Sequence, residues 1–431
     1  MTAAAPAAQG ARPSPTGLSW EAVAAAIMAA LVAMRTEVAG GIVVGDCAAL
    51  VLLPVTWTAV RRSRGFTWLL VVAALAVVAG WVLSLAAVGE FTVLVSARRS
   101  VLLLAAGLPA VVATLVWASR RLSLRGAVAA FGVGMVIDNL SLLQTSPNPW
   151  KFGLGVAVAV TLTALTQGLG RPVQATIAGV LAVSFLLADS RATSGFMLLI
   201  MALLVWQAVA ATLPVRHWSP ARLRLNQSLL VAGMTLAAVT AVVAASLSGY
   251  LGQDAQARTA AQAAGTTNPF LAARPELGAS WALLTHRPWG YGAGVMPRYE
   301  DVRVAMNGMK ELGYNPDNGY VQQYMFGNGF ELHSGLVDAW IALSVPGAAL
   351  MVLGVLMALR ALRTDLGTLR TRAWLLIAVL VTIMNVLVGP LTILPPFLAI
   401  VMATALEDEP RAAPTTPSPV RRSARPLPGG G

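Results

Sequence analysis

A small set of histidine and arginine side chains could do chemistry where polar sequence meets apolar sequence. His333 stands where a water-exposed stretch, residues 249–332, returns to an apolar run. Imidazole has an unperturbed pKa near about 6.5 and accepts a proton at neutral pH. Arg191, Arg274 and Arg287 lie in polar segments expected on the same side as His333, and guanidinium groups bind phosphate oxygens in pairs. These residue types predict a base, His333, acting beside a phosphate-bearing substrate.

The elements that must position these residues are membrane helices. Hydrophobic residues make up 57% of the chain, charged residues 11%, and the mean hydropathy is +0.71. A soluble protein cannot bury so much apolar side chain, so the composition predicts an all-α, polytopic membrane helical bundle. Apolar runs of about 17 to 25 residues cross the hydrocarbon layer as helix. We expect about twelve spans, at 18–36, 39–60, 66–89, 100–118, 124–143, 152–169, 172–188, 193–214, 225–248, 333–359, 373–389 and 391–406.

Arginine positions predict how this bundle is oriented. With the N-terminus in the cytoplasm, most arginines of the short loops lie inside, and the long stretch 249–332 lies outside. Both termini are then cytoplasmic, and His333 faces the outer side of the cytoplasmic (inner) membrane. The net charge of +12 is explained by this topology and by attraction to anionic lipids, so nucleic acid is not an expected partner.

Composition divides the chain into five parts. Residues 1–17 and 407–431 are too polar and proline-rich to bury, and we expect them to be disordered cytoplasmic tails. Residues 18–248 hold the first nine apolar runs, and 333–406 hold the last three. Between them, 249–332 form a large extracytoplasmic loop that is expected to carry part of the active site.

Acidic residues inside or beside the apolar runs point to the same end of the bundle. Asp46, Asp138 and Asp189 fall in the outer half of their runs. Ionisable groups within a membrane are costly and generally face a polar cavity or a partner. We therefore name Asp46, Asp189 and Asp338 as possible supporting groups for the site. The alternative for Asp46 and Asp189 is a structural helix contact or contact with lipid headgroups.

The loop contains a glycine-rich segment, Arg287–Gly294. No strand precedes it and nucleotides are absent outside the cell, so a dinucleotide site is not expected, and the glycines instead predict a close-packed turn. Because no Asp-x-Asp motif occurs in the chain, we expect neither a metal nor a cofactor. The single cysteine, Cys47, lies in an apolar run, so packing on the membrane domain rather than a disulfide must order the loop.

Four short motifs resemble those of the O-antigen ligase and polysaccharide polymerase superfamily. They are the outer-loop turn Arg287-Pro288-Trp289-Gly290-Tyr291-Gly292, the helix-entry residue His333, the element Ser344-Val345-Pro346-Gly347 and the pair Ser190-Arg191. The resemblance covers residues 180–350 by motif and the whole chain by topology. The sequence departs from the family pattern at Ser334, Ala342 and Ser344, where the family favours Asn, Glu and Gly.

The resemblance implies a GT-C-like membrane glycosyltransferase. Such enzymes move a glycan from a polyprenyl (undecaprenyl) diphosphate donor to an acceptor hydroxyl on the outer face of the cytoplasmic membrane, with inversion and without a metal. In that scheme His333 is the catalytic group that orients or deprotonates the hydroxyl. Arg191 and Arg287, with Arg274 as a third candidate, bind the donor diphosphate and stabilise its departing charge. The acceptor is a glycan, a lipid or a protein.

Other functions fit the same pattern. A repeat-unit polymerase of the same superfamily, a SEDS-type peptidoglycan polymerase or a protein O-oligosaccharyltransferase differs in its acceptor. A flippase or other transporter of polyprenyl-linked glycans is a different class, but its charges should also line the inner half of the membrane, and here they cluster outward. His333 could instead be a helix cap, and Arg98 and Arg99 could meet either headgroups or the diphosphate. The aromatic residues of Gly319–Phe330 predict an interfacial belt, with a platform for an acceptor sugar as the alternative.

Overall fold

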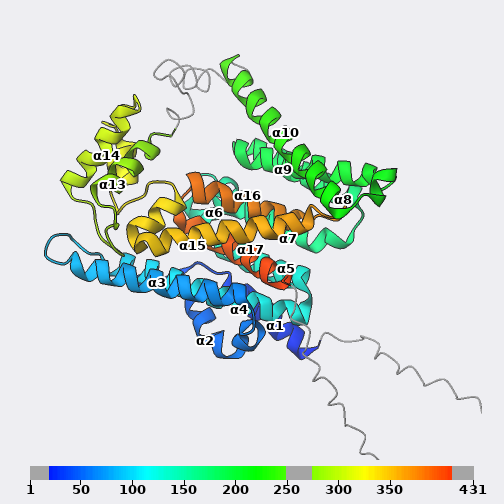
Figure 1. Cartoon of the computed structure of the whole chain (residues 1–431), viewed down its shortest axis with the longest axis horizontal. Coiled ribbons are helices and arrows are strands. Elements are labelled where there is room, and N and C mark those ends of the chain that lie inside the picture. The colour runs from blue at the N-terminus through cyan, green and yellow to red at the C-terminus, as the bar shows by residue number, and fades with distance from the viewer. Residues whose placement is uncertain (1–18, 249–273, 410–431) are drawn as a thin grey trace, which may run out of the picture.

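The computed structural model describes residues 19–248 and 274–409, which are mostly helical (Figure 1). The helices are α1 (Trp20–Val32), α2 (Val44–Val60), α3 (Arg64–Ala86), α4 (Val95–Leu122), α5 (Leu124–Asp138), α6 (Leu142–Thr145), α7 (Gly155–Leu165), α8 (Arg171–Leu187), α9 (Arg191–Ala210), α10 (Pro220–Leu247), α13 (Glu276–His286), α14 (Tyr299–Glu311), α15 (Gly335–Asp365), α16 (Ala373–Val388) and α17 (Pro395–Glu407). Short 3-10 or π turns are η1 (Asn139–Ser141), η2 (Trp150–Leu154), η3 (Thr166–Gly168), η4 (Pro214–His217), η5 (Tyr320–Met325) and η6 (Leu391–Ile393), and β1 (Glu37–Ala39) pairs with β2 (Ile42–Val43). The predicted N-terminal tail, the first part of the predicted loop and nearly all of the predicted C-terminal tail lie outside the described residues.

Each of the twelve predicted apolar runs contains a helix. Within the described residues, five segments are long and apolar enough to span a membrane: Arg64–Ala86, Val95–Leu122, Leu124–Thr145, Arg191–Ala210 and Gly335–Asp365. Five further apolar helices are shorter: α1, α2, α8, α16 and α17. The predicted helical fold is therefore confirmed, with five candidate membrane spans among the described residues, and the number of twelve spans stays a prediction.

Glycine and proline explain why several helices are shorter than their apolar runs. α1 ends before a hairpin whose turn is Gly40-Gly41, with φ values of 51° and 86°. α16 ends at Gly389-Pro390, and Pro395-Pro396 form the first turn of α17. Proline lacks the amide hydrogen that a helix interior requires, but it fits the first helical turn.

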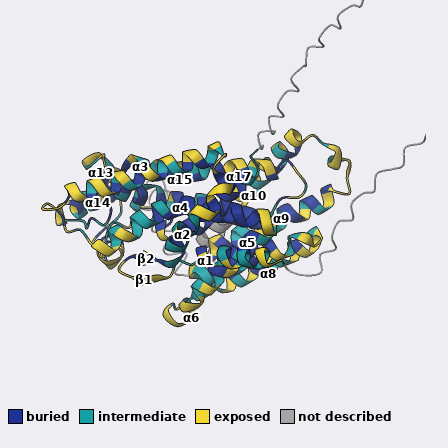
Figure 2. Cartoon of the chain, turned by 90° about the horizontal axis from the view of Figure 1, so that it is seen from below, coloured by how far each residue is buried: buried dark blue, intermediate teal, exposed yellow. Residues whose placement is uncertain are grey.

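α4 lies at the centre of the helical bundle. It packs against α1, α2, α3, α5 and α17, and residues from Leu104 to Ser119 are almost all buried. Figure 2 shows the buried residues gathered along the middle of the molecule. The absence of a side chain at Gly107 lets α2 approach, because a Cβ there would lie 2.8 Å from the Cβ of Asp46. This close approach brings a carboxylate into the bundle.

α3 presents an apolar stripe on the outside of the bundle. Its exposed apolar residues follow helical spacing: Trp68, Val71, Leu75, Val78, Trp81, Val82 and Leu85. An exposed apolar stripe of this length is costly in water and favourable against lipid chains. The surface of α3 therefore fits a membrane rather than an aqueous environment.

The bundle has two ends, because successive helices run in opposite directions. Contacts between segments far apart in the sequence define each end: Thr36 Oγ1 donates to Asp138 (2.6 Å) at one, and Ser63 Oγ donates to Glu409 (2.6 Å) at the other. The first, which also receives residues 274–334 before α15, is called the loop end below. The second is called the Arg372 end.

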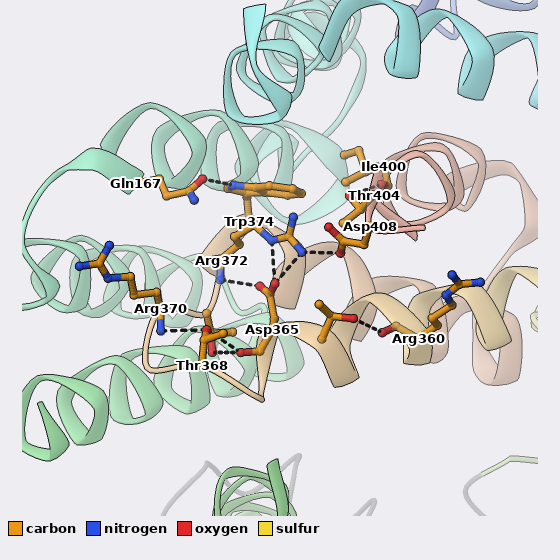
Figure 3. A network of polar contacts seen from close by, with 12 residues as sticks. Gln167, Arg360, Asp365, Thr368, Arg370, Arg372, Trp374, Ile400, Thr404 and Asp408 are labelled. Atoms are coloured by element: carbon orange, nitrogen blue, oxygen red, sulfur yellow. Dashed lines mark hydrogen bonds and ion pairs between the residues drawn. The ribbon is translucent and has the colours of Figure 1, made fainter. Parts of the chain in front are cut away.

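A dense polar network holds the Arg372 end together (Figure 3). The Arg372 guanidinium donates to Asp365 Oδ1 (2.8 Å from Nε) and to Asp408 Oδ2 (2.9 Å), and the Arg372 backbone N–H donates to Asp365 Oδ2 (2.7 Å). Beside it, Trp374 Nε1 donates to Gln167 Oε1 (2.7 Å). These contacts tie the ends of α15, α16 and α17 to the turn after α7.

Residues 274–332 form a small helical layer, with α13 and α14 beside the bundle (Figure 1). The glycine-rich turn joins this layer to the membrane helices: Tyr291 and Gly292 donate their backbone N–H groups to the Ile341 carbonyl (2.8 and 3.0 Å). A Cβ at Gly292 would lie 2.5 Å from the Ser84 nitrogen, and Gly292 has a φ of 108°. The predicted close-packed turn is confirmed, and so is ordering of this part of the loop by packing on the membrane helices.

Candidate functional site at the loop end

His333 lies immediately before α15 and has a left-handed backbone conformation (φ 49°). The N-cap of α15 is the next residue, Ser334, whose Oγ accepts from the Val337 N–H (3.5 Å). One turn into the helix, Asp338 Oδ1 accepts from the Leu332 N–H (2.9 Å) and so holds the chain on the other side of His333. Ser334 performs the capping, so a helix-cap role does not account for the imidazole.

The imidazole of His333 belongs to a cluster with two tyrosines of η5. Its ring centroid lies 5.4 Å from that of Tyr324 and 5.9 Å from that of Tyr320. The Tyr320 hydroxyl donates to Glu276 Oε1 (2.5 Å) at the start of α13. Burial, then the hydrogen bond to Glu276 and the charge of that carboxylate, raise the pKa of Tyr320, while nearby Arg274 acts in the opposite direction. The structure therefore ties the ring beside His333 to the start of α13, two residues after Arg274 in the chain.

The aromatic residues after Gly319 divide between two environments. Phe326 is buried in the core of the loop layer, and the Phe330 ring lies 4.4 Å from that of Tyr291. Tyr324 is 59% exposed and joins His333 instead. The predicted interfacial belt is wrong for the two phenylalanines, because the loop builds its own apolar core from them.

Arg287 lies in a different cluster, at the connection between α3 and α4. Its Nη2 is 3.5 Å from Glu90 Oε2, and its guanidinium carbon lies 4.7 Å above the Phe91 ring and 5.4 Å above the Tyr291 ring. Arg298 shares both partners, at 3.0 Å from Glu90 and 4.2 Å from the Phe91 ring. These contacts give Arg287 a role in anchoring the turn, and none of them joins it to His333.

Arg191 begins α9 beside a strained acidic residue. Asp189 has a φ of 52°, and its carboxylate bridges Arg191 Nε and Lys151 Nζ, each at 3.3 Å. The hydrogen bond and charge of Lys151, followed by the charge of Arg191, lower the pKa of Asp189. The three side chains form a row of alternating charge at the loop end.

Lys151 also lines a cavity of about 220 Å³ among the membrane helices. Its polar lining residues are Arg35, Asp138, Asn139, Lys151, Thr193, Asn385 and Thr392, and its apolar lining includes Phe152, Val156, Val381, Met384, Ile393 and Phe397. A cavity lined by both charged and apolar residues fits an amphiphile whose headgroup is polar and whose tail is apolar.

Asp46 forms an ion pair with Arg35, which lines this cavity. Arg35 Nη1 donates to Asp46 Oδ1 (2.6 Å), and Asp46 is 2% exposed. The second oxygen, Oδ2, has no hydrogen-bond partner among the described residues. A buried carboxylate is stabilised chiefly by such a pair, so Arg35 is held at the cavity by a charge of opposite sign.

One carboxylate connects His333 with the cavity. Asp338 also interacts with the backbone of Leu391, the first residue of η6, and η6 packs against α15. The next two residues of η6, Thr392 and Ile393, line the cavity. Asp338 thus fixes the backbone that carries His333 and lies beside the segment that forms part of the cavity lining.

The structure brings together some of the predicted residues and separates others. Asp46 and Asp189 pair with Arg35 and Lys151, which line the cavity, and Arg191 pairs with Asp189. Asp338 lies between His333 and this region, and Arg287 lies apart. The sequence did not lead us to expect Arg35 or Lys151 among the site residues. Lys151 is one of two lysines in an arginine-rich chain, a signal that could have singled it out.

Comparison with known protein families, with curated proteins and with solved structures finds no match for this chain. In the part of the chain that the structure describes, no group of three His, Cys, Asp or Glu side chains is placed to hold a metal ion.

Proposed function

We propose that this chain is a membrane glycosyltransferase of the O-antigen ligase type, which moves a glycan from a polyprenyl diphosphate to an acceptor hydroxyl. In this proposal twelve helices cross the cytoplasmic membrane in a GT-C-like arrangement, both termini are cytoplasmic, and the loop end faces outward. The observation that carries the proposal is the Asp338 junction. There the side chain that holds the backbone before His333 lies beside η6, whose Thr392 and Ile393 line the charged cavity.

The tautomer of His333 suits proton acceptance. Nδ1 lies 3.3 Å from the Glu331 carbonyl oxygen. A carbonyl can only accept a hydrogen bond, so this contact favours the tautomer with the proton on Nδ1 and leaves Nε2 as the acceptor. Nε2 is then the atom that takes the proton of the attacking hydroxyl.

The proposed reaction is a direct displacement. The acceptor oxygen attacks the anomeric carbon, its proton passes to His333 Nε2, and the bond from that carbon to the diphosphate oxygen breaks with inversion. The electron pair leaves on the lipid diphosphate, where Arg191 and Lys151 stabilise the growing negative charge. Arg274 supplies a further positive charge from the loop side, and Arg287 acts by holding the glycine-rich turn.

The acceptor decides among the related enzymes. If the acceptor is a growing polymer, the protein is a repeat-unit polymerase. If the acceptor is a lipid or a protein, the enzyme is a ligase or a protein glycosyltransferase. Surface glycans of cells with and without the protein separate these cases. Loss of a ligase leaves long lipid-linked chains, and loss of a polymerase leaves single repeat units.

The decisive experiment uses the purified chain in sealed vesicles with labelled undecaprenyl-diphosphate-linked glycan, acceptor and no ion gradient. We expect label to become joined to the acceptor, and His333→Asn to abolish the transfer. Label that crosses the vesicle membrane without joining the acceptor contradicts the proposal and supports a flippase. The proposal is also contradicted if the label neither joins the acceptor nor crosses the vesicle membrane when the donor and acceptor have been isolated from cells.

A further inference from the structure

The rings of Tyr320, Tyr324 and His333 form a triangular cluster rather than a column. Their centroids make a triangle with sides of 5.4, 5.9 and 6.0 Å, and the ring planes differ by 15° to 39°. In a column the outermost rings would lie about twice as far apart as neighbours, so no ring here is sandwiched between the other two. Tyr324 is 59% exposed and Tyr320 37% exposed. Part of the aromatic surface therefore faces outward beside the imidazole.

Charged groups border this aromatic surface. Tyr320 is tied to Glu276 by its hydroxyl, and the second carboxylate oxygen, Glu276 Oε2, is buried without a partner among the described residues. Arg274 lies two residues before Glu276 in the chain. An entirely apolar ligand would leave these groups unsatisfied. A ligand with an apolar face and a hydroxyl-bearing edge satisfies both the rings and the charges.

A pyranose ring has that combination of surfaces. Its axial C–H groups present an apolar face that packs on the negative face of an aromatic ring, and its equatorial hydroxyls both donate and accept hydrogen bonds. We infer that Tyr320, Tyr324 and His333 form a platform for a pyranose ring of the acceptor, with Glu276 and Arg274 at its hydroxyl edge. This inference rests on the proposed function, because only a glycosyltransferase would use the bound sugar as its acceptor. It extends that function by naming a sugar as the group that receives the glycan.

The platform also explains how the acceptor hydroxyl meets its base. Because His333 adjoins both tyrosines, a sugar stacked on the tyrosines lies beside the imidazole, and a second hydroxyl edge of that sugar can meet Nε2. Tyr324 then acts as a positioning residue. Its removal should weaken acceptor binding more than it lowers the rate of transfer within the bound complex.

Binding is tested without any transfer reaction. The full chain in detergent micelles is probed by saturation-transfer NMR with methyl glycosides of glucose, galactose, mannose and N-acetylglucosamine. We expect ring C–H signals of at least one glycoside to be saturated by the wild type and by Tyr324→Phe, and to fall roughly fivefold in Tyr324→Ala. Tyr299→Ala, which removes an 81% exposed tyrosine from the start of α14, is the matched control and should equal the wild type. Equal saturation by Tyr324→Ala and wild type, or none by the wild type, overturns the platform.

A kinetic test separates this inference from the proposed function. In the transfer assay with a saccharide acceptor, Tyr324→Ala should raise the acceptor KM by roughly fivefold to tenfold and change kcat by less than about twofold. If the wild type binds glycosides but transfers no glycan, the proposed transferase function is refuted and the sugar platform is still supported. Transfer that is equally efficient in wild type and Tyr324→Ala keeps the transferase and refutes the platform.

Discussion

At the Arg372 end, charge is neutralised by direct pairing, whereas at the loop end charge is arranged around open space. Arg372 contacts both Asp365 and Asp408, and its side chain is 14% exposed. At the loop end, Arg35 and Lys151 each have one acidic partner and also face the 220 Å³ cavity. The first arrangement fastens three helices to one another. The second leaves positive charge available to a ligand.

Backbone strain also differs between the two ends, and more of the strained residues lie at the loop end. Within the described residues, four non-glycine residues have positive φ: Ser123, Asp189, His333 and Ser344. Asp189 and His333 lie at the loop end, while Ser123 joins α4 to α5 at the opposite end and Ser344 lies inside α15. Such conformations cost about 1 to 3 kcal/mol and persist where packing enforces them, often at functional sites. The difference fits the proposal that the loop end carries the chemistry while the Arg372 end contributes stability.

The largest expected effect is on catalysis, from a change at the loop end. His333→Asn removes the imidazole, and asparagine tolerates the left-handed backbone that alanine would strain. We expect transfer to fall by about 100-fold to 10,000-fold, the usual contribution of a general base. The midpoint of thermal unfolding should stay close to the wild-type value. Wild-type transfer by this variant removes His333 from the mechanism.

The next largest effect is on stability, from a change at the Arg372 end. Arg372→Ala leaves Asp365 buried without its partner, which should lower the free energy of unfolding by about 3 to 5 kcal/mol in a denaturing-detergent titration. Transfer per folded molecule should be unchanged. Arg370→Ala, at an exposed position in the same turn, is the matched control and should shift stability by less than about 0.5 kcal/mol. A loss of activity in folded Arg372→Ala would contradict the division between the ends.

A smaller effect is expected where α15 bends between the two ends. Ser344 has φ 61° and ψ −161°, a region that glycine adopts without strain. Ser344→Gly should therefore stabilise the fold by about 1 kcal/mol. Ser344→Ala keeps the Cβ and should bring no gain. Equal stability of the two variants would show that the bend is unstrained.

The smallest effect concerns the row of charges at Asp189. Its pKa is lowered from 3.8 by Lys151 and Arg191, so its stabilising contribution is present at neutral pH and is lost as pH falls through the folded-state pKa. Asp189→Asn keeps the side-chain shape and the tolerance for positive φ. We expect a slightly lower unfolding midpoint than wild type at pH 7, with the difference vanishing in acid. A difference that grows in acid would contradict the pairing.

Local sequence predicted much of the architecture and little of the charge pairing. Each apolar run became a helix, and the glycines of Arg287–Gly294 became a close-packed turn, because both features depend on residues next to one another. Arg287 was expected at the diphosphate, but its partner Glu90 lies 197 residues away in the chain. The tyrosines of η5 were likewise expected in a belt, and the fold turned them toward His333.

Composition and the spacing of apolar runs by themselves determined that this chain is a helical membrane protein, since the cost of exposing apolar side chains to water does not depend on tertiary arrangement. The order of polar and apolar segments also determined that the candidate residues gather toward one end. Only the tertiary structure decided which of them meet: His333 with Tyr324, Asp338 with η6, and Arg35 with Asp46 at a cavity. Hydrogen bonds and ion pairs act over a few ångströms in space, and helix packing alone brings distant parts of a chain within that range.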